Sequence, residues 1–304
     1  MEGPLKETMV IVVCLVASMW ITWRSLASRN LAAADVDQVA NTFQQVNPQH
    51  PLFSSYEDQI LYVQGDTNKQ WFADNFFGMR VEALAVKRTV EVMVARVEKQ
   101  PEGRSRTTYD WSPQDALVTN QFLKCPSIQM GSFNIDPDFL DQVRDLPYLP
   151  CDESTLTELP QIDGFFGRCD PPYFVFTQIS DSTQPGDFRV SFQVIPPTLS
   201  LFGLQKDQTL HQVKGHEGRV LGLVAHGIQD SDTVLAKSKR MVTSAANLFL
   251  WLASILFALA CAQIASILTR RSGYAFFQKS PNVAGGILGF TIGLMAFRFL
   301  LGLI

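Results

Sequence analysis

The stretch from Met241 to Leu268 contains no charged side chain. About 20 apolar residues in a helix suffice to cross a lipid bilayer, so this stretch predicts a membrane-spanning helix. A second apolar stretch, residues 283–304, follows after a basic loop at residues 269–282. The C-terminal quarter of the chain therefore predicts two membrane-spanning helices joined by a short loop.

Small residues recur at every fourth position in both of these stretches. This spacing places them on one helix face, where two backbones can approach closely in lipid. The residues are Ser254, Ala258, Ala262 and Ser266 in the first stretch and Gly285, Gly289 and Gly293 in the second. We expect the two rows to pack on each other within the chain. Packing of the glycine row on another subunit is the alternative.

A third apolar run lies near the N-terminus, where a polar lead at residues 1–7 precedes the apolar residues 8–24. A secretory signal peptide has a similar length, but it normally begins with a basic region. Here Lys6 is offset by two glutamates. Trp20 and Trp23 lie where the aromatic belt of a membrane–water interface belongs. We interpret this run as an uncleaved membrane anchor.

Residues 25–230 have the mixed polarity of a globular domain. Residues 31–46 are spaced like an amphipathic helix, and alternating apolar and polar side chains then predict strands. Hairpins are predicted from Val86 to Trp111 and from Tyr173 to Ile195, the second with a type II turn at Pro185–Gly186. We therefore predict an α+β membrane protein with three transmembrane helices and one large β-rich α+β extramembrane domain.

The segment after the second hairpin predicts the approach to the membrane. Pro196–Pro197 should stop the preceding strand, and two more strands are predicted at Leu210–Val213 and Arg219–Val224. Ser231 or Asp232 should then cap a helix over residues 231–268 that continues into the membrane.

The cysteines predict no metal site. Cys125, Cys151 and Cys169 lie outside the predicted spans and have no Cys-x-x-Cys spacing, so a zinc site is not expected. In an oxidising compartment, Cys151 and Cys169 are the candidate pair for a disulfide. The interpretation that we favour from the sequence is three buried thiols.

No catalytic constellation is present in the sequence. The histidines are scattered, and both a nucleophile elbow and a glycine-rich phosphate loop are absent. The formal net charge of −4 and the lack of a basic cluster argue against nucleic acid as a partner. We predict that the protein is not an enzyme and binds no cofactor.

Arg298 is a charged residue within the last apolar stretch. A central charge in a span costs about 3 kcal/mol on insertion scales. Because Arg298 lies close to Ile304, we expect its side chain to reach the headgroup region. The alternative is a contact with a partner subunit or with an anionic lipid.

Four segments together resemble the LUMA family, also called transmembrane protein forty-three. The clearest is Gly186–Phe192, which reads Gly-Asp-Phe-Arg-Val-Ser-Phe. The others are Lys87–Glu91 with its return strand Thr108–Trp111, Gln129–Phe133 followed by Leu140–Val143, and His226–Gly227.

The resemblance implies an N-terminal span, a large lumenal domain and a cluster of C-terminal spans. Members are associated with the endoplasmic reticulum and the inner nuclear membrane, where they organise other membrane proteins. This chain departs from the family in having two predicted C-terminal spans where three are expected.

The function predicted from this resemblance is a non-enzymatic integral membrane scaffold at an endoplasmic reticulum or inner nuclear type of membrane. One alternative is an accessory structural subunit of a large organellar complex, for example a respiratory complex in an organellar inner membrane. A membrane-tethered enzyme is a further alternative. The expected partners are other membrane proteins and the lipid bilayer, within a homo-oligomer or a larger complex.

Overall fold

The structure, a computed structural model, describes residues 3–49, 54–74, 76–77, 79–99, 105–113, 118–151, 162, 164–180, 182–271, 290–291, 293 and 295. The chain divides into two compact units. Unit 1 comprises residues 1–40, 215–221 and 237–304, and unit 2 comprises residues 41–214 and 222–236.

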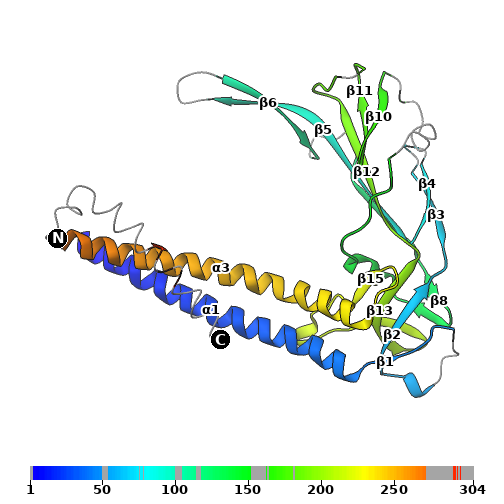
Figure 1. Ribbon diagram of the computed structural model, residues 1–304, viewed down its shortest axis with the longest axis horizontal. Coiled ribbons are helices and arrows are strands. Elements are labelled where there is room, and N and C mark those ends of the chain that lie inside the picture. The colour runs from blue at the N-terminus through cyan, green and yellow to red at the C-terminus, as the bar shows by residue number, and fades with distance from the viewer. Residues whose placement is uncertain are drawn as a thin grey trace. The chain divides into compact units, whose positions relative to one another are not determined.

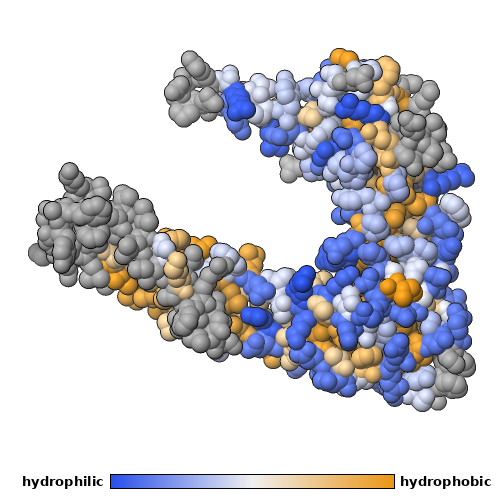
Figure 2. Space-filling view, in the orientation of Figure 1, coloured by the Kyte–Doolittle hydropathy of each residue, from blue (hydrophilic) through white to orange (hydrophobic). Residues whose placement is uncertain are grey.

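Two long helices dominate unit 1, α1 (Gly3–Thr42) and α3 (Ser231–Arg271), and they run antiparallel (Figure 1). Among the described residues, these two helices are long and apolar enough to cross a membrane, over Met9–Thr42 and Ser231–Ile267. Figure 2 shows apolar residues along the surface of this pair. Met19 and Leu248 are each 70% exposed. An apolar surface of this kind suits contact with lipid rather than water.

The predicted anchor at residues 8–24 and most of the predicted amphipathic helix at residues 31–46 form one continuous helix, α1, which ends at Thr42, before β1. The intervening residues 25–30 contain neither proline nor glycine, so nothing in them interrupts the helix. Of the predicted span at residues 283–304, only residues 290, 291, 293 and 295 are described, and these are helical. The rest lies outside the described residues, so the third transmembrane helix stays a prediction.

The helix α3 begins one residue after its cap. The carboxylate of Asp230 accepts hydrogen bonds from the backbone N–H of Thr233 (2.6 Å) and from its hydroxyl (2.9 Å). These bonds lower the pKa of Asp230 and satisfy a donor that a helix start leaves unpaired. The predicted caps, Ser231 and Asp232, are therefore wrong by one or two positions.

Within the described residues, unit 2 contains two large sheets and one small sheet. The seven-stranded sheet has the order β1-β2-β13-β14-β9-β8, with β15 paired to β13, and the six-stranded sheet has the order β10-β11-β12-β5-β6, with β7 paired to β5.

The strands of the first sheet are β1 (Gln44–Gln45), β2 (Ile60–Asp66), β8 (Ile128–Met130), β9 (Phe133–Ile135), β13 (Thr198–Lys206), β14 (Thr209–Gln212) and β15 (Val224–His226). Those of the second are β5 (Ala85–Lys99), β6 (Ser105–Ser112), β7 (Gln121–Lys124), β10 (Phe166–Asp170), β11 (Tyr173–Thr177) and β12 (Phe188–Ile195). The small sheet pairs β3 (Gln70–Ala73) with β4 (Arg80–Ala83). Short 3-10 helices lie at η1 (Ser54–Tyr56), η2 (Pro137–Gln142) and η3 (His216–Gly218).

Both predicted hairpins are confirmed. Strand β5 pairs antiparallel with β6, and β11 pairs antiparallel with β12. Gly186 has φ +97° in the turn before β12, a conformation that glycine adopts without strain. Strand β12 ends at Ile195, directly before Pro196–Pro197, as the missing proline N–H groups require.

Strand β13, which pairs with β2, β14 and β15, was not predicted from the sequence. Most of its side chains are buried, so it lacks the alternation by which a half-buried strand is recognised. The predicted strand at Arg219–Val224 is wrong. The segment follows η3 and turns at Gly222, whose φ is +64°, and β15 begins only at Val224.

The described residues of unit 2 form two hydrophobic cores. One lies around β2, β8, β9 and β13 and buries aliphatic residues with Phe133 and Phe139. The other lies mainly on β5, β11 and β12 and is rich in aromatic side chains. It buries Phe174, Phe176, Phe188 and Phe192, together with Phe77 from the segment between β3 and β4.

Candidate functional site

The predicted small-residue row of α3 is largely buried. Ser254, Ala258 and Ser266 are buried, and Ala262 is half-buried. A Cβ atom added to Gly293 would lie 3.0 Å from the Cα of Ala258 and 2.8 Å from the Cβ of Cys261. Gly293 therefore packs on α3 of the same chain, and a larger residue would force the two segments apart. Gly285, Gly289 and Arg298 lie outside the described residues.

The segment 215–221, called the 215–221 loop below, is held between α1 and α3. From α1, the buried carboxylate of Asp35 accepts the backbone N–H of His216 (3.0 Å) and contacts the His216 ring. From α3, the hydroxyl of Ser238 donates to the carbonyl of Leu221. The helices are also joined directly, because Lys239 forms an ion pair with Asp37 at 2.8 Å. These contacts fix the polar end of the helix pair.

Gly215 is essential to this arrangement, and we predict that Gly215→Ala releases the 215–221 loop. A Cβ at this position would lie 2.1 Å from the Oδ2 atom of Asp35. Relieving that overlap should cost about 2 kcal/mol. In the full-length protein, trypsin cleavage after Lys214 and Arg219 should become more than about tenfold faster, because it follows the population of the open loop.

A double-mutant cycle provides the control for this loop. In an Asp35→Ala background the overlap with the carboxylate is gone and only the 2.9 Å approach to the residue 35 Cβ remains, so Gly215→Ala should raise the cleavage rate by a smaller factor. Equal effects of Gly215→Ala in both backgrounds would contradict the proposed contact.

Two of the family-like segments lie on paired strands of unit 2. Arg189 on β12 is opposite Glu91 on β5, and its Nε atom lies 2.6 Å from the Glu91 Oε2 atom. The Arg189 guanidinium also lies 3.9 Å from the ring centre of Tyr173 and 4.7 Å from that of Trp111. Cation–π contacts of this kind hold an arginine between aromatic rings. These segments therefore serve the packing of the sheet.

Asp187, in the clearest family-like segment, is fully buried. Its carboxylate accepts backbone N–H groups from Gln178 (2.9 Å) and Gln184 (2.7 Å). This one side chain thus holds both the end of β11 and the turn that leads into β12.

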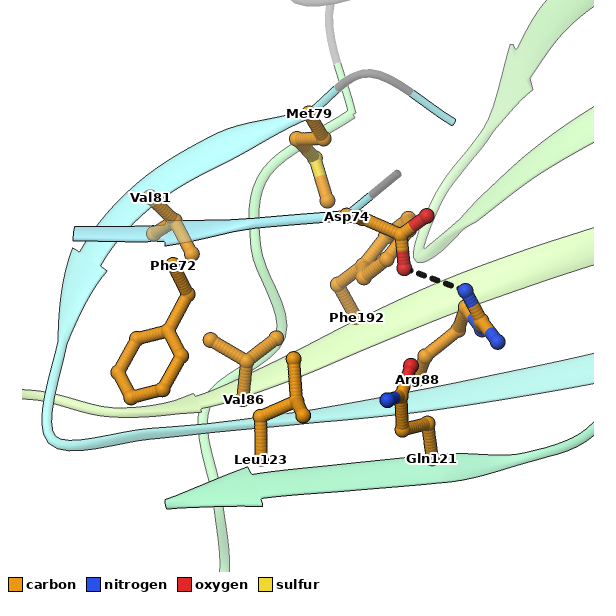
Figure 3. Close-up of a pocket in the computed structure, with 9 residues that line it drawn as sticks. All are labelled: Phe72, Asp74, Met79, Val81, Val86, Arg88, Gln121, Leu123 and Phe192. Carbon is orange, nitrogen blue, oxygen red and sulfur yellow. Dashed lines mark hydrogen bonds and ion pairs between the residues drawn. The ribbon is translucent and has the colours of Figure 1, made fainter. Parts of the chain in front are cut away.

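A second buried acid lies in an apolar hollow of unit 2 (Figure 3). The Nη1 atom of Arg88 is 2.5 Å from the Oδ2 atom of Asp74, and the two side chains are 9% and 8% exposed. Arg88 also donates to the carbonyl of Thr119 (2.9 Å), and Asp74 accepts the N–H groups of Phe76 and Phe77. Phe72, Val86 and Leu123 are among the surrounding side chains. The pair joins β5 to the end of β3.

We predict that Arg88→Met lowers the free energy of unfolding of unit 2 by about 3 kcal/mol. Removing one member of a buried pair leaves the other charge without a partner, although Asp74 would keep its two backbone donors. Urea denaturation of the full-length protein in detergent, followed by near-ultraviolet circular dichroism, measures this change. The exposed neighbour Lys87 supplies the control, since Lys87→Met should have an effect below about 0.5 kcal/mol.

The cysteines outside the predicted spans and Tyr62 are disulfide-bonded or held in buried positions of the fold. Cys151 and Cys169 form a disulfide, which leaves Cys125 as the free thiol of the three outside the predicted spans. Burial raises the pKa of the Cys125 thiol, which disfavours the reactive thiolate. Burial likewise raises the pKa of Tyr62, whose hydroxyl donates to the carbonyl of Gln229. Among the described residues, no group of three or more histidine, cysteine, aspartate or glutamate side chains could hold a metal ion.

Comparison with known proteins gives one family. Residues 100–303 match the family described as Transmembrane protein 43. The match includes Gln129–Phe133, Gly186–Phe192 and His226–Gly227, whereas Lys87–Glu91 precedes it. No curated protein and no solved structure matched the chain.

Proposed function

The chain belongs to the Transmembrane protein 43 family and is a membrane protein, and from this premise we propose that it acts as a non-enzymatic scaffold for other membrane proteins. The proposed location is the endoplasmic reticulum or the nuclear envelope. Its two long helices anchor it, and unit 2 offers a large β-rich surface for partners.

The main support for a binding role comes from what the family-like segments do. Asp187 caps backbone groups, Arg189 pairs with Glu91, and Arg88 pairs with buried Asp74. Each of these polar groups stabilises the fold of unit 2. Polar side chains that serve catalysis would instead converge on an accessible cleft.

One exposed face of the β5–β6 hairpin is suited to a partner. Val97 is 64% exposed and Tyr109 is 60% exposed. Because Val97 pairs with Thr107 and Ala95 pairs with Tyr109, Val97 and Tyr109 are diagonal neighbours on one side of the hairpin. Exposed aromatic and aliphatic side chains are common anchors of protein interfaces.

The test is purification of the tagged full-length protein from its native membranes in mild detergent, followed by mass spectrometry and native gels. We expect several membrane proteins to co-purify in variable proportions. Val97→Ser with Tyr109→Ser should deplete them, while Glu98→Gln on the other side of the hairpin should not. Recovery in one large complex of fixed stoichiometry would instead support an accessory subunit. Covalent labelling of a unit 2 residue by an activity-based probe would support an enzyme.

A further inference from the structure

Two adjoining hollows lie on α1 within unit 1, and both are lined by Trp20, Arg24 and Ser28. These three residues are four positions apart and form one row on the helix. The first hollow, called the basic hollow below, is further lined by Trp23, Ala27, Leu31, Glu217 and Arg219. The second, called the apolar groove, lies between α1 and α3 and is further lined by Ile21, Ser25, Ala245, Ala246, Phe249 and Leu252.

The basic hollow contains two guanidinium groups that no carboxylate neutralises within the described part of the chain. Arg24 is exposed, and its guanidinium lies 5.6 Å from the ring centre of Trp20. Arg219 donates to the hydroxyl of Ser28 at 3.2 Å, which leaves further N–H donors of its guanidinium available. Glu217 lines the same hollow without an ion pair to either arginine. Two positive charges against one negative charge leave the hollow positive.

The two hollows share part of their α1 lining and differ in the residues that face it. Arg24 closes the apolar run of α1, and Trp20 and Trp23 are of the residue type that gathers at the membrane–water interface. Phe249 and Leu252 lie inside the charge-free stretch of α3. With the helices in a bilayer, both hollows lie side by side at the depth of Arg24, and the apolar groove runs along α3 to Leu252 in the charge-free stretch.

We propose that the two hollows together bind one anionic phospholipid of the surrounding bilayer. Its phosphate binds between Arg24 and Arg219, and an acyl chain lies in the apolar groove against Ile21 and Phe249. Arginine suits this role because its fixed donors match phosphate oxygens. A phospholipid has an anionic headgroup and apolar acyl chains, which match the basic hollow and the adjoining apolar groove. A partner helix would instead require an apolar surface along its whole length.

The test uses the full-length protein in lipid nanodiscs or detergent, titrated with phosphatidylserine and, separately, with phosphatidylcholine. Native mass spectrometry counts the bound lipids. We expect one phosphatidylserine to be retained in preference to phosphatidylcholine. Arg24→Gln should weaken its binding by about tenfold, as loss of a charged hydrogen-bond donor implies. Arg24 is chosen for substitution because its side chain is exposed and contacts the Trp20 ring at the surface, so its loss should not disturb the fold.

Two further variants separate a built site from general charge attraction. Arg29→Gln removes a positive charge from α1 outside both hollows, so it should leave binding unchanged. Ala245→Trp fills the apolar groove without altering charge, so it should also weaken binding. Each variant is first checked for the wild-type helical content by circular dichroism.

Three results would overturn the proposal. The first is equal retention of phosphatidylserine by wild type and Arg24→Gln. The second is an equal loss in Arg29→Gln, which would show diffuse attraction. The third concerns a photo-crosslinker placed at Phe249 in native membranes: capture of a polypeptide in place of lipid would assign the groove to a partner helix.

Discussion

Replacing Asp187 with alanine is expected to lower the free energy of unfolding of unit 2 by about 4 kcal/mol. The carboxylate is fully buried and accepts two backbone N–H groups, from Gln178 and Gln184. Hydrogen bonds to a charged acceptor are worth about 1.5–3 kcal/mol each. Alanine would leave both backbone N–H groups without their carboxylate partner, at the point where β11 turns into β12.

Equilibrium urea denaturation of the full-length protein in detergent measures this loss, with near-ultraviolet circular dichroism as the signal of tertiary structure. Asp187→Asn is a second informative variant. The oxygen of its amide can accept one of the two backbone N–H groups, whereas its NH2 group would face the other N–H donor. It should lie between wild type and alanine. Asp110→Ala, at an exposed position on β6, is the control and should change stability by less than about 0.5 kcal/mol. A loss as small as that for Asp187→Ala would contradict the assigned role.

Gly131→Ala is expected to destabilise unit 2 by a similar amount, about 4 kcal/mol. Gly131 connects β8 to β9 with φ +56°, a conformation that disfavours alanine by about 1 kcal/mol. A Cβ there would also lie 2.0 Å from the carbonyl oxygen of Pro48. That oxygen accepts the N–H of Ser132 at 2.8 Å, so the backbone segments cannot separate without breaking this bond.

Gly227→Ala isolates the two contributions at Gly131. Gly227 also has a left-handed backbone, with φ +76°, but a Cβ there would have nothing within 4 Å. Its substitution should therefore cost only about 1 kcal/mol. The same urea denaturation applies to both variants. If the two substitutions cost the same, the collision with Pro48 does not contribute.

The elements that the sequence predicts well are those whose signal is local. A charge-free stretch identifies the spanning part of α3, because the cost of a charge in lipid depends on each residue alone. Alternating apolar and polar side chains identify β5 and β12, because in each strand one face is more buried than the other. Gly186 marks the turn before β12 for a similar local reason, namely its backbone conformation.

The elements that the sequence analysis missed depend on distant partners. Strand β13 follows two prolines and lacks alternation, because side chains on both of its faces are buried. The family-like segments were recognised from the sequence, but their purpose was not. Only the register of β5 against β12 places Arg189 beside Glu91.

The two hollows on α1 had one partial signal in the sequence. Trp20, Trp23 and Arg24 suggested a position at the membrane interface, but nothing near them in the chain indicated Arg219. The return of the chain through Gly215 brings that residue to Ser28, because Asp35 binds the backbone of the 215–221 loop.

The sequence by itself determined that this protein has apolar helices suited to a membrane, a β-rich domain between them, and membership of its family. Those properties follow from the solvation and backbone preference of individual residues, which act over a few neighbours. Tertiary structure alone decided which strands pair, which acids are buried, and which arginines share a hollow. Such contacts join residues far apart in the chain, and local preferences do not encode the choice among distant partners.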